Sequence, residues 1–238
     1  MTHLASVLAA SGMPPPDAIG HRIVHGGPAR RQHCEDSTVP RLLKAAAAFA
    51  PLHTPAALAP IRLAHAHCPD VPQVACFDTR LHVGLPDVVV VLPTARDLRS
   101  ESIQRFRFHG LWLESIVRQL GDALPQRLLV AHLGNGASIT AVKAGLSIDS
   151  GMAMMPSGGV IMVTRSGNLD PGVLVHLLRE KKFDAAMLEG LVDQLSGLLG
   201  ISGLSGDMRV CRKRLHRTAM RAWPSKCSVI RYANRWPR

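Results

Sequence analysis

The sequence predicts an α/β fold with β-hairpins among its strands, and three observations support this. Two apolar segments, residues 127–133 and 137–142, flank Gly134-Asn135-Gly136, and an Asn-Gly pair between such segments is a strong hairpin signal because it tolerates positive φ. Residues 172–180 and 184–199 have the amphipathic pattern of helices. Hydrophobic residues make up 47% of the 238 positions, which is enough to form a core.

The other elements are predicted from shorter patterns, in chain order. Before the hairpin we expect a helix, a strand, a second helix, a second strand and an interrupted helix, over residues 3–10, 21–25, 39–49, 74–77 and 98–120. Prolines punctuate residues 51–60, and no helix is assigned there. After the hairpin, a turn at residues 143–145 leads into another apolar segment. Asp170-Pro171 then begins a helix, with Asp as its N-cap and Pro at its first position.

The composition argues against several classes of protein. No apolar run reaches the roughly 18 residues of a membrane span. The first five residues lack the charged and apolar regions of a secretory signal. The five cysteines form no C-x-x-C pair, so neither a zinc ribbon nor a disulfide framework is indicated. We therefore expect a reducing, cytoplasmic setting and no membrane contact.

The net charge of +11 is concentrated at the C-terminal end. Residues 210–238 hold nine Lys and Arg and no Asp or Glu, whereas the rest of the chain carries 19 basic against 17 acidic residues. The same segment contains Trp223, Trp236 and Tyr232. A basic arm with interleaved aromatics is typical of nucleic-acid binding, and a solvated tail is the plainer interpretation. We favour a third, a shift of reading frame, for which the motifs below give the reason.

Several residues could contact an anion. Gly134-Asn135-Gly136 is either an ordinary turn or a turn whose backbone N–H groups approach a phosphate. The planar guanidinium groups of Arg22, Arg165 and Arg209 suit phosphate and carboxylate, although a surface salt bridge is the more common role of any single arginine.

Three further residues could take part in catalysis. His109 and His132 lie in apolar surroundings, where structural histidines are more common than catalytic ones. Asp78 ends an apolar strand and either caps the next turn or faces a cleft. The sequence contains no Walker A motif and no set of residues with the spacing of a strong metal-binding motif. Taken singly, these residues leave the function open.

Taken together, they fall into motifs that occur in one order. The motifs are HRIVHGG at 21–27, APLHTP at 50–55, FDT at 77–79, FRFHG at 106–110, HLGNGAS at 132–138, TRSGNLDP at 164–171, and SGLLGISG at 196–203 with DMR at 207–209. In this order they closely resemble acetate kinase, of the acetate and propionate kinase family, over about residues 15–209.

The resemblance implies a duplicated actin-like ATPase (ribonuclease H-like) fold, incomplete in both lobes, with the active site between the lobes. Residues 1–125 would be the remainder of the N-terminal, acyl-substrate lobe, residues 126–209 the start of the C-terminal, nucleotide-binding lobe, and residues 210–238 a basic tail outside the family. The implied reaction uses ATP and Mg²⁺ and converts acetate to acetyl phosphate. The resemblance also implies a homodimer, and a nucleic-acid partner is not expected.

The resemblance also implies roles for individual residues. Arg22 and Arg165 flank the transferring phosphoryl group, His109 donates to it, and Asp78 is the catalytic carboxylate near the acceptor and the metal. The apolar pocket for the acyl group is formed by Val24, Leu58, Phe108 and Pro156. The ATP phosphates contact His132, Gly134, Asn135 and Gly136, and the adenosine contacts Asp207, Met208 and Arg209. The metal ligands in this chain stay unknown.

The sequence also departs from the family pattern. Leu111-Trp112-Leu113 is bulky where the family has small polar residues. The family's amino-terminal phosphate turn and its late metal-site Glu have no counterpart, and the resemblance stops at Arg209. Read two bases out of frame, the degenerate codons for Val210–Asn234 permit a family-like amphipathic helix. We therefore hypothesise a 5′-truncated, frameshifted gene whose product has little kinase activity, the alternative function being an inactive fragment with residual nucleotide binding.

Overall fold

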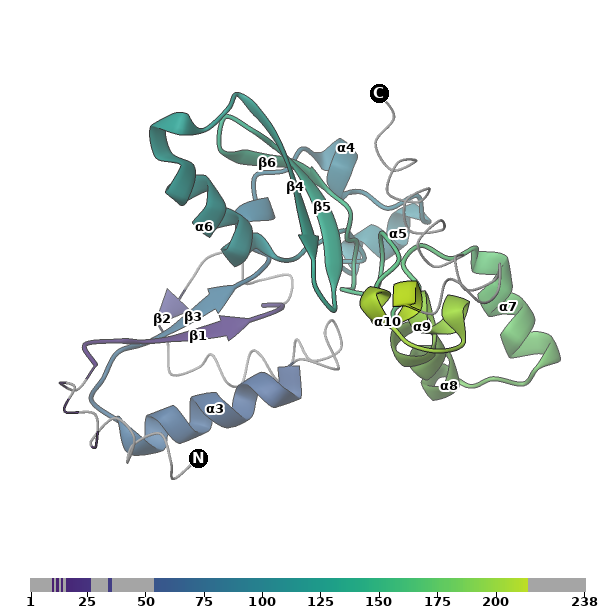
Figure 1. The fold of residues 1–238 in the computed structure, drawn as a ribbon, viewed down its shortest axis with the longest axis horizontal. Helices are drawn as coiled ribbons and strands as arrows, with labels where there is room; N and C mark the ends of the chain where they lie inside the picture. The colour runs from purple at the N-terminus through teal and green to yellow at the C-terminus, as the bar shows by residue number, and fades with distance from the viewer. Residues whose placement is uncertain are drawn as a thin grey trace. The chain divides into compact units, whose positions relative to one another are not determined.

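The computed structural model describes residues 16–26, 34–35 and 54–213, with a few single positions before residue 16, and the chain divides into two compact units (Figure 1). The first unit holds the described residues up to Val83 and, again, Phe108–Gln119. The second holds Gly84–Arg107 and the residues from Leu120 onward. The lobe boundary at residue 125 stays a prediction. The helices expected at residues 3–10 and 39–49, and the basic segment beyond residue 213, lie outside or almost outside the described residues.

The first unit is built on a small mixed sheet of order β1-β3-β2. Strand β1 (Ile19–Ile23) pairs in parallel with β3 (Gln73–Phe77), and β2 (Cys34–Glu35) pairs antiparallel with β3. The strand predicted at 74–77 is thereby confirmed. The one predicted at 21–25 begins and ends two residues earlier than expected.

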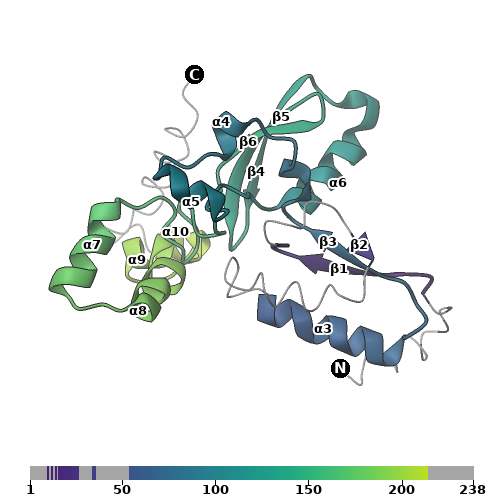
Figure 2. The same cartoon turned by 180° about the vertical axis from the view of Figure 1, so that it is seen from behind.

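Helix α3 (Thr54–His67) runs along this sheet in both views (Figures 1 and 2). It buries Leu58 and Ile61 against Ile23, Ala75 and Phe77, which together form the core of the unit. From Thr54 onward the proline-rich stretch is therefore helical, with Pro60 inside the helix, although the sequence analysis assigned no helix there. Interior proline normally disfavours helix. The apolar contacts of Leu58 and Ile61 offset that cost, and a local reading of the sequence does not include them.

Short elements connect the sheet to the rest of the chain. They are η2 (Arg80–His82), α4 (Asp87–Val90), α5 (Arg96–Ser100), α6 (Gly110–Leu120) and η3 (Gly121–Ala123). The helix predicted over 98–120 is thus two helices, and the interruption expected near residues 108–110 lies immediately before α6.

The second unit contains an antiparallel meander of order β4-β5-β6, formed by β4 (Arg127–Leu133), β5 (Ala137–Lys143) and β6 (Leu146–Ser150). The predicted hairpin is confirmed, with Leu133 opposite Ala137 across the turn. The turn from β5 to β6 has Ala144 and Gly145 at positive φ, 48° and 80°.

The helices of the second unit follow: α7 (Pro171–Glu180), α8 (Ala185–Gly190), the π-helical turn η4 (Leu191–Leu195), α9 (Gly197–Ser202) and α10 (Met208–Lys213). The cap of α7 is as predicted, since the Asp170 side chain accepts from Gly172 N at 2.7 Å. The helix predicted over 184–199 is broken at Ser196, after η4 ends at Leu195, and Gly197, with a φ of +64°, begins α9. Among the described residues, no helix is long and apolar enough to cross a membrane.

Candidate functional site

Arg22 and Asp78 form an ion pair at the carboxyl ends of the parallel strands β1 and β3. The register places Arg22 opposite Cys76, so Asp78, two residues further on, lies on the same face of the sheet as Arg22. Arg22 Nη2 donates to Asp78 Oδ2 at 2.7 Å and Nε to Oδ1 at 3.3 Å. The carboxylate side chain is 2% exposed and the arginine 63% exposed. The hydrogen bonds to Asp78 raise the pKa of Arg22, so its guanidinium stays protonated while it pairs with the carboxylate.

The backbone of Asp78 is fixed on both sides. Asp78 N donates to Ile23 O at 2.9 Å, which continues the ladder between β1 and β3. Gly110 N donates to Asp78 O at 2.7 Å. A Cβ at Gly110 would collide with that carbonyl oxygen, so the first residue of α6 has to be glycine for this contact to form. We call Arg22, Asp78 and Gly110 the Arg22 cluster.

His109 is placed directly before α6 by the same contact. Its backbone has a φ of +64°, in the left-handed region, and its carbonyl accepts from Leu113 N at 3.1 Å, which begins the helix. Its side chain is 8% exposed. The preceding Phe108 O accepts from the buried His82 ring at 3.0 Å. The structure thus brings Arg22 and Asp78 together and carries His109 on the loop that contacts Asp78.

The residues predicted to form the acyl pocket belong to both units. Val24 is half-buried, Leu58 packs in the core of the first unit, and Phe108 is 1% exposed against the His25 ring, with centroids 5.6 Å apart. Burial lowers the pKa of His25 to about 4, so this ring is neutral at pH 7. Pro156 is buried in the second unit. Their role in holding an acyl group stays a prediction.

Arg165 lies in the second unit, on a segment held against η4 and α9. Ser166 N donates to Val192 O at 2.8 Å and Ser196 N to Thr164 O at 3.0 Å. Arg165 Nη1 donates to Pro156 O at 3.3 Å. Burial lowers the pKa of Arg165, and the charge of Asp193 partly opposes this. The convergence of Arg165 with Arg22 and His109, expected from the resemblance, stays a prediction.

A cavity of about 340 Å³ lies beside this segment. Its lining combines small and apolar residues from the loop before α7 and from η4 and α9, namely Ile161, Ser166, Leu169, Leu195, Ser196, Gly197, Gly200 and Ile201.

The predicted phosphate-binding turn is the tip of the β4–β5 hairpin. It is closed by Gly134 N donating to Gly136 O at 3.0 Å, and Gly134 and Asn135 are exposed. Asn135 O accepts from Val163 N at 3.4 Å, which ties the turn to the segment that carries Arg165. His132 is half-buried on β4. The four predicted contacts of the ATP phosphates and the cationic residue Arg165 thus belong to connected parts of one unit.

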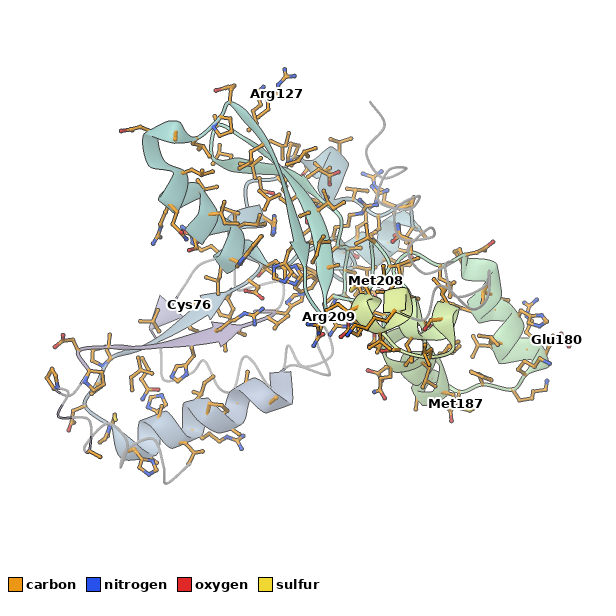
Figure 3. All side chains as sticks on the ribbon, viewed as in Figure 1. Cys76, Arg127, Glu180, Met187, Met208 and Arg209 are labelled. Atoms are coloured by element: carbon orange, nitrogen blue, oxygen red, sulfur yellow. The ribbon has the colours of Figure 1, made fainter. Side chains whose placement is uncertain are left out.

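The predicted adenosine contacts stand at the start of α10, where Met208 and Arg209 are labelled in Figure 3. Arg209 Nη2 donates to Asp207 Oδ2 at 2.7 Å, and Arg209 N donates to Asp207 Oδ1 at 2.7 Å. These bonds lower the pKa of Asp207 to about 2. The pair is largely exposed, so both charges face solvent where a polar ligand could reach them.

Comparisons with known proteins identify the family of the chain. The acetokinase family profile matches residues 13–235. The chain belongs to the acetokinase family. This range includes most of residues 210–238. The boundary at Arg209 stays a prediction.

Curated relatives of this acetokinase-family chain include the acetate kinase of Gloeobacter violaceus, 41% identical over 216 residues, which are 87% of this chain and 53% of that protein. The acetate kinase of Clavibacter michiganensis is 44% identical over 205 residues, or 82% of this chain and 51% of that protein. The chain spans about half the length of the curated relatives it matches.

Solved structures show the same relationship. Porphyromonas gingivalis acetate kinase has a TM-score of 0.82 at 32% identity, covering 90% of this chain and 56% of that one. A Francisella tularensis propionate kinase has a TM-score of 0.89 at 31% identity, covering 98% and 62%. The fold is therefore that of the acetate kinases, the actin-like ATPase fold that the motifs predicted.

Two buried charged residues of this acetokinase-family chain escaped the sequence analysis. Arg107 is fully buried, has a φ of +62°, and donates to Val89 O and, at 3.0 Å, to Asp149 Oδ1. Arg107 lies within the FRFHG motif, and this position could have identified it as a candidate from the sequence. Asp193 is 5% exposed in η4. It lies in a helical pattern, where an acidic residue ordinarily faces solvent, so no local signal identified it.

Proposed function

We propose that this chain carries residues of an acetate kinase site, at which the γ-phosphoryl group of ATP moves to acetate. The bond between the γ-phosphorus and the bridging oxygen of ADP breaks, and a bond from phosphorus to an acetate oxygen forms, giving ADP and acetyl phosphate. The observation that carries the proposal is the Arg22–Asp78 pair, held at the carboxyl ends of two parallel strands beside His109 in a chain of the acetokinase family.

The charges fit this chemistry. Phosphoryl transfer depends on in-line positioning and on positive charge around the equatorial oxygens of the transferring group. The two hydrogen bonds that Arg22 donates to Asp78 fix the orientation of the guanidinium, while its 63% exposure leaves it open to an anionic substrate. In the proposal, Arg22 binds the acetate carboxylate and the phosphoryl group, His109 donates to the phosphoryl oxygens, and Arg165 supplies the second cation.

ATP is the proposed phosphoryl donor. His132 and the exposed turn at Gly134, Asn135 and Gly136 would contact its phosphates, and Asp207, Met208 and Arg209 its adenosine. The exposed turn and the solvent-facing charges of Asp207 and Arg209 support these roles. Mg²⁺ is implied by the resemblance, but among residues 54–213 and the shorter described segments no group of three His, Cys, Asp or Glu could hold it.

The acyl group would contact Val24, Leu58, Phe108 and Pro156. An apolar pocket distinguishes acetate from propionate by about 1–3 kcal/mol per methylene, so a mixed preference is compatible with these residues. The proposal includes a homodimer, as the resemblance implies, and a cytoplasmic location, which the pattern of cysteines in the sequence favours. Size-exclusion chromatography with light scattering tests the first, because it gives the mass of the species in solution.

The test is a comparison of turnover and binding in the 238-residue chain. Acetyl phosphate is trapped as the hydroxamate, and ATP binding is measured by calorimetry in the same buffer. Turnover of about 1 s⁻¹ or faster, lost in Arg22→Ala and retained in Arg118→Ala, would establish the kinase. Arg118 is a suitable control because it pairs with Glu114 on the exposed surface of α6.

The alternative is a non-catalytic chain that binds nucleotide, and it rests on the exposed turn at Gly134 and Asn135 and on the solvent-facing charges of Asp207 and Arg209. ATP binding without turnover would favour this alternative and agree with the expectation of little activity. Absence of both turnover and ATP binding would overturn both candidates. The flanking DNA gives a separate test of the frameshift hypothesis, which predicts a family-like continuation of residues 210–238 in a shifted frame.

A further inference from the structure

Asp193 is a buried carboxylate within a turn of π-helix. Its residue is 5% exposed, and its Oδ1 accepts no hydrogen bond from the described residues. Placing a carboxylate in such a position costs free energy unless a positive charge lies close enough to compensate. π-Helical turns are rare and occur frequently at functional sites. A positively charged side chain on a neighbouring segment would therefore explain how the Asp193 carboxylate can be buried.

The segment packed against Asp193 is the one that carries Arg165. Thr164 Oγ1 donates to Asp193 O at 2.8 Å, and Ser166 N donates to Val192 O at 2.8 Å. Thr164 and Ser166 are the two chain neighbours of Arg165, so their hydrogen bonds hold the backbone of Arg165 next to the π-helical turn. The negative charge of Asp193 acts on the guanidinium of Arg165 and stabilises its charged form against burial.

We infer that Asp193 is an internal counter-ion for Arg165 and competes with the anionic substrate for its charge. The inference rests on the proposed function, in which Arg165 binds the phosphoryl group. Without substrate, the carboxylate balances a half-buried guanidinium and keeps it in place. With substrate, the same carboxylate repels the phosphate oxygens. Asp193 is therefore a positioning residue that stabilises the chain and weakens substrate binding.

The two effects have opposite signs, and this makes the inference testable with Asp193→Asn in the 238-residue chain. We expect a melting temperature lower by about 2–4 °C, because a half-buried cation loses its counter-charge. We expect ATP to bind about 3- to 10-fold more tightly, because one repulsive charge near the phosphates is gone. A residue with a structural role alone would lower the melting temperature and leave ATP binding unchanged or weaker, and that result would overturn the inference.

The matched control is Asp184→Asn. It makes the same change of charge in the same unit, and the amide oxygen can still accept the capping bond from Met187 N that Asp184 accepts at 2.8 Å. Neither the melting temperature nor ATP binding should change appreciably. Tighter binding in this control as in Asp193→Asn would mean that net charge causes the effect, and would also overturn the inference.

A double-mutant cycle separates the inference from the proposed function, because it needs no ligand. Arg165→Gln and Asp193→Asn should each lower the melting temperature, and the double variant should lose at least about 2 °C less than the sum of the two. Additive losses would overturn the inference even if ATP binds. If the unaltered chain binds no ATP, the proposed function fails, and the cycle alone decides whether Asp193 compensates Arg165.

Discussion

The chain has two arginine clusters. In both, a glycine begins a helix close to a backbone carbonyl, but the charges around the two arginines differ. In the Arg22 cluster, Gly110 begins α6 and approaches the carbonyl of Asp78. In the Arg165 cluster, defined here as Arg165, Asp193 and Gly197, Gly197 begins α9 and approaches the carbonyls of Met162 and Arg165. In each case the missing side chain lets the start of a helix lie against the segment that carries a candidate site residue.

The charges differ. Arg22 is in direct contact with a buried carboxylate and largely exposed, and its pKa is raised. Arg165 is bound by a backbone carbonyl and half-buried, and its pKa is lowered by burial. The first cluster therefore depends on a short ion pair, and the second on backbone geometry and on a charge acting without a short contact. Replacing a glycine should therefore lower the free energy of unfolding more in the Arg165 cluster. Replacing a charged residue should lower it more in the Arg22 cluster.

Gly197→Ala should have the largest effect. The position has a φ of +64° and a new Cβ would collide with the carbonyl of Met162, so strain and overlap add. We expect the free energy of unfolding to fall by about 3 kcal/mol or more, measured by urea denaturation. Gly190→Ala is the control, since Gly190 is helical with open space at its Cβ, and should stabilise by about 0.5–1 kcal/mol. A neutral Gly197→Ala would contradict the close approach.

Acid should destabilise the unit that contains the Arg22 cluster. The pKa of His25 is about 4 in the folded chain and about 6.5 when exposed, so unfolding takes up a proton between these values. Stability from this group is therefore constant above pH 6.5 and falls as the pH decreases from 6.5 to 4, by up to about 3 kcal/mol. Urea midpoints measured across that range test this. In His25→Gln the decrease in unfolding free energy between pH 6.5 and pH 4 should be smaller by the contribution of His25. If the pH profile of this variant is unchanged, another group causes the decrease.

Gly110→Ala tests the backbone contact of the Arg22 cluster. Steric overlap alone opposes the new Cβ, with Asp78 O above all and with Leu81 Cβ at 3.1 Å, because φ at Gly110 is not positive. We expect a loss of about 2–3 kcal/mol in unfolding free energy, smaller than at Gly197. Gly84→Ala, at a position with open space around its Cβ, should stay within about 0.5 kcal/mol of the unaltered chain. Equal losses at Gly110 and Gly84 would remove the argument for a close contact.

Arg22→Ala tests the ion pair and should have the smallest of these effects. It leaves the Asp78 carboxylate, 2% exposed, without its cation, which costs about 2 kcal/mol. The matched surface variant is Arg118→Ala, whose partner Glu114 is one helical turn away, and it should cost about 0.5 kcal/mol or less. Similar losses in the two variants would show that the Arg22–Asp78 pair behaves as an ordinary surface pair.

Local signals in the sequence were sufficient for the hairpin and for α7. The Asn-Gly turn and the Asp170-Pro171 start each act within a few residues, so neighbouring side chains and backbone angles decide them without help from distant segments. The ordered motifs were likewise sufficient for the family and its fold, which the comparisons confirm.

Tertiary structure alone decided the rest. Helix α3 forms through Pro60 because Leu58 and Ile61 pack on a sheet whose strands lie on either side of it in the sequence. Arg22 meets Asp78 because β1 and β3 pair in parallel, which joins residues 56 positions apart. Asp193 is buried because the Arg165 segment packs on η4. Each of these depends on contacts between distant segments, and such contacts leave no periodic pattern in the residues that make them.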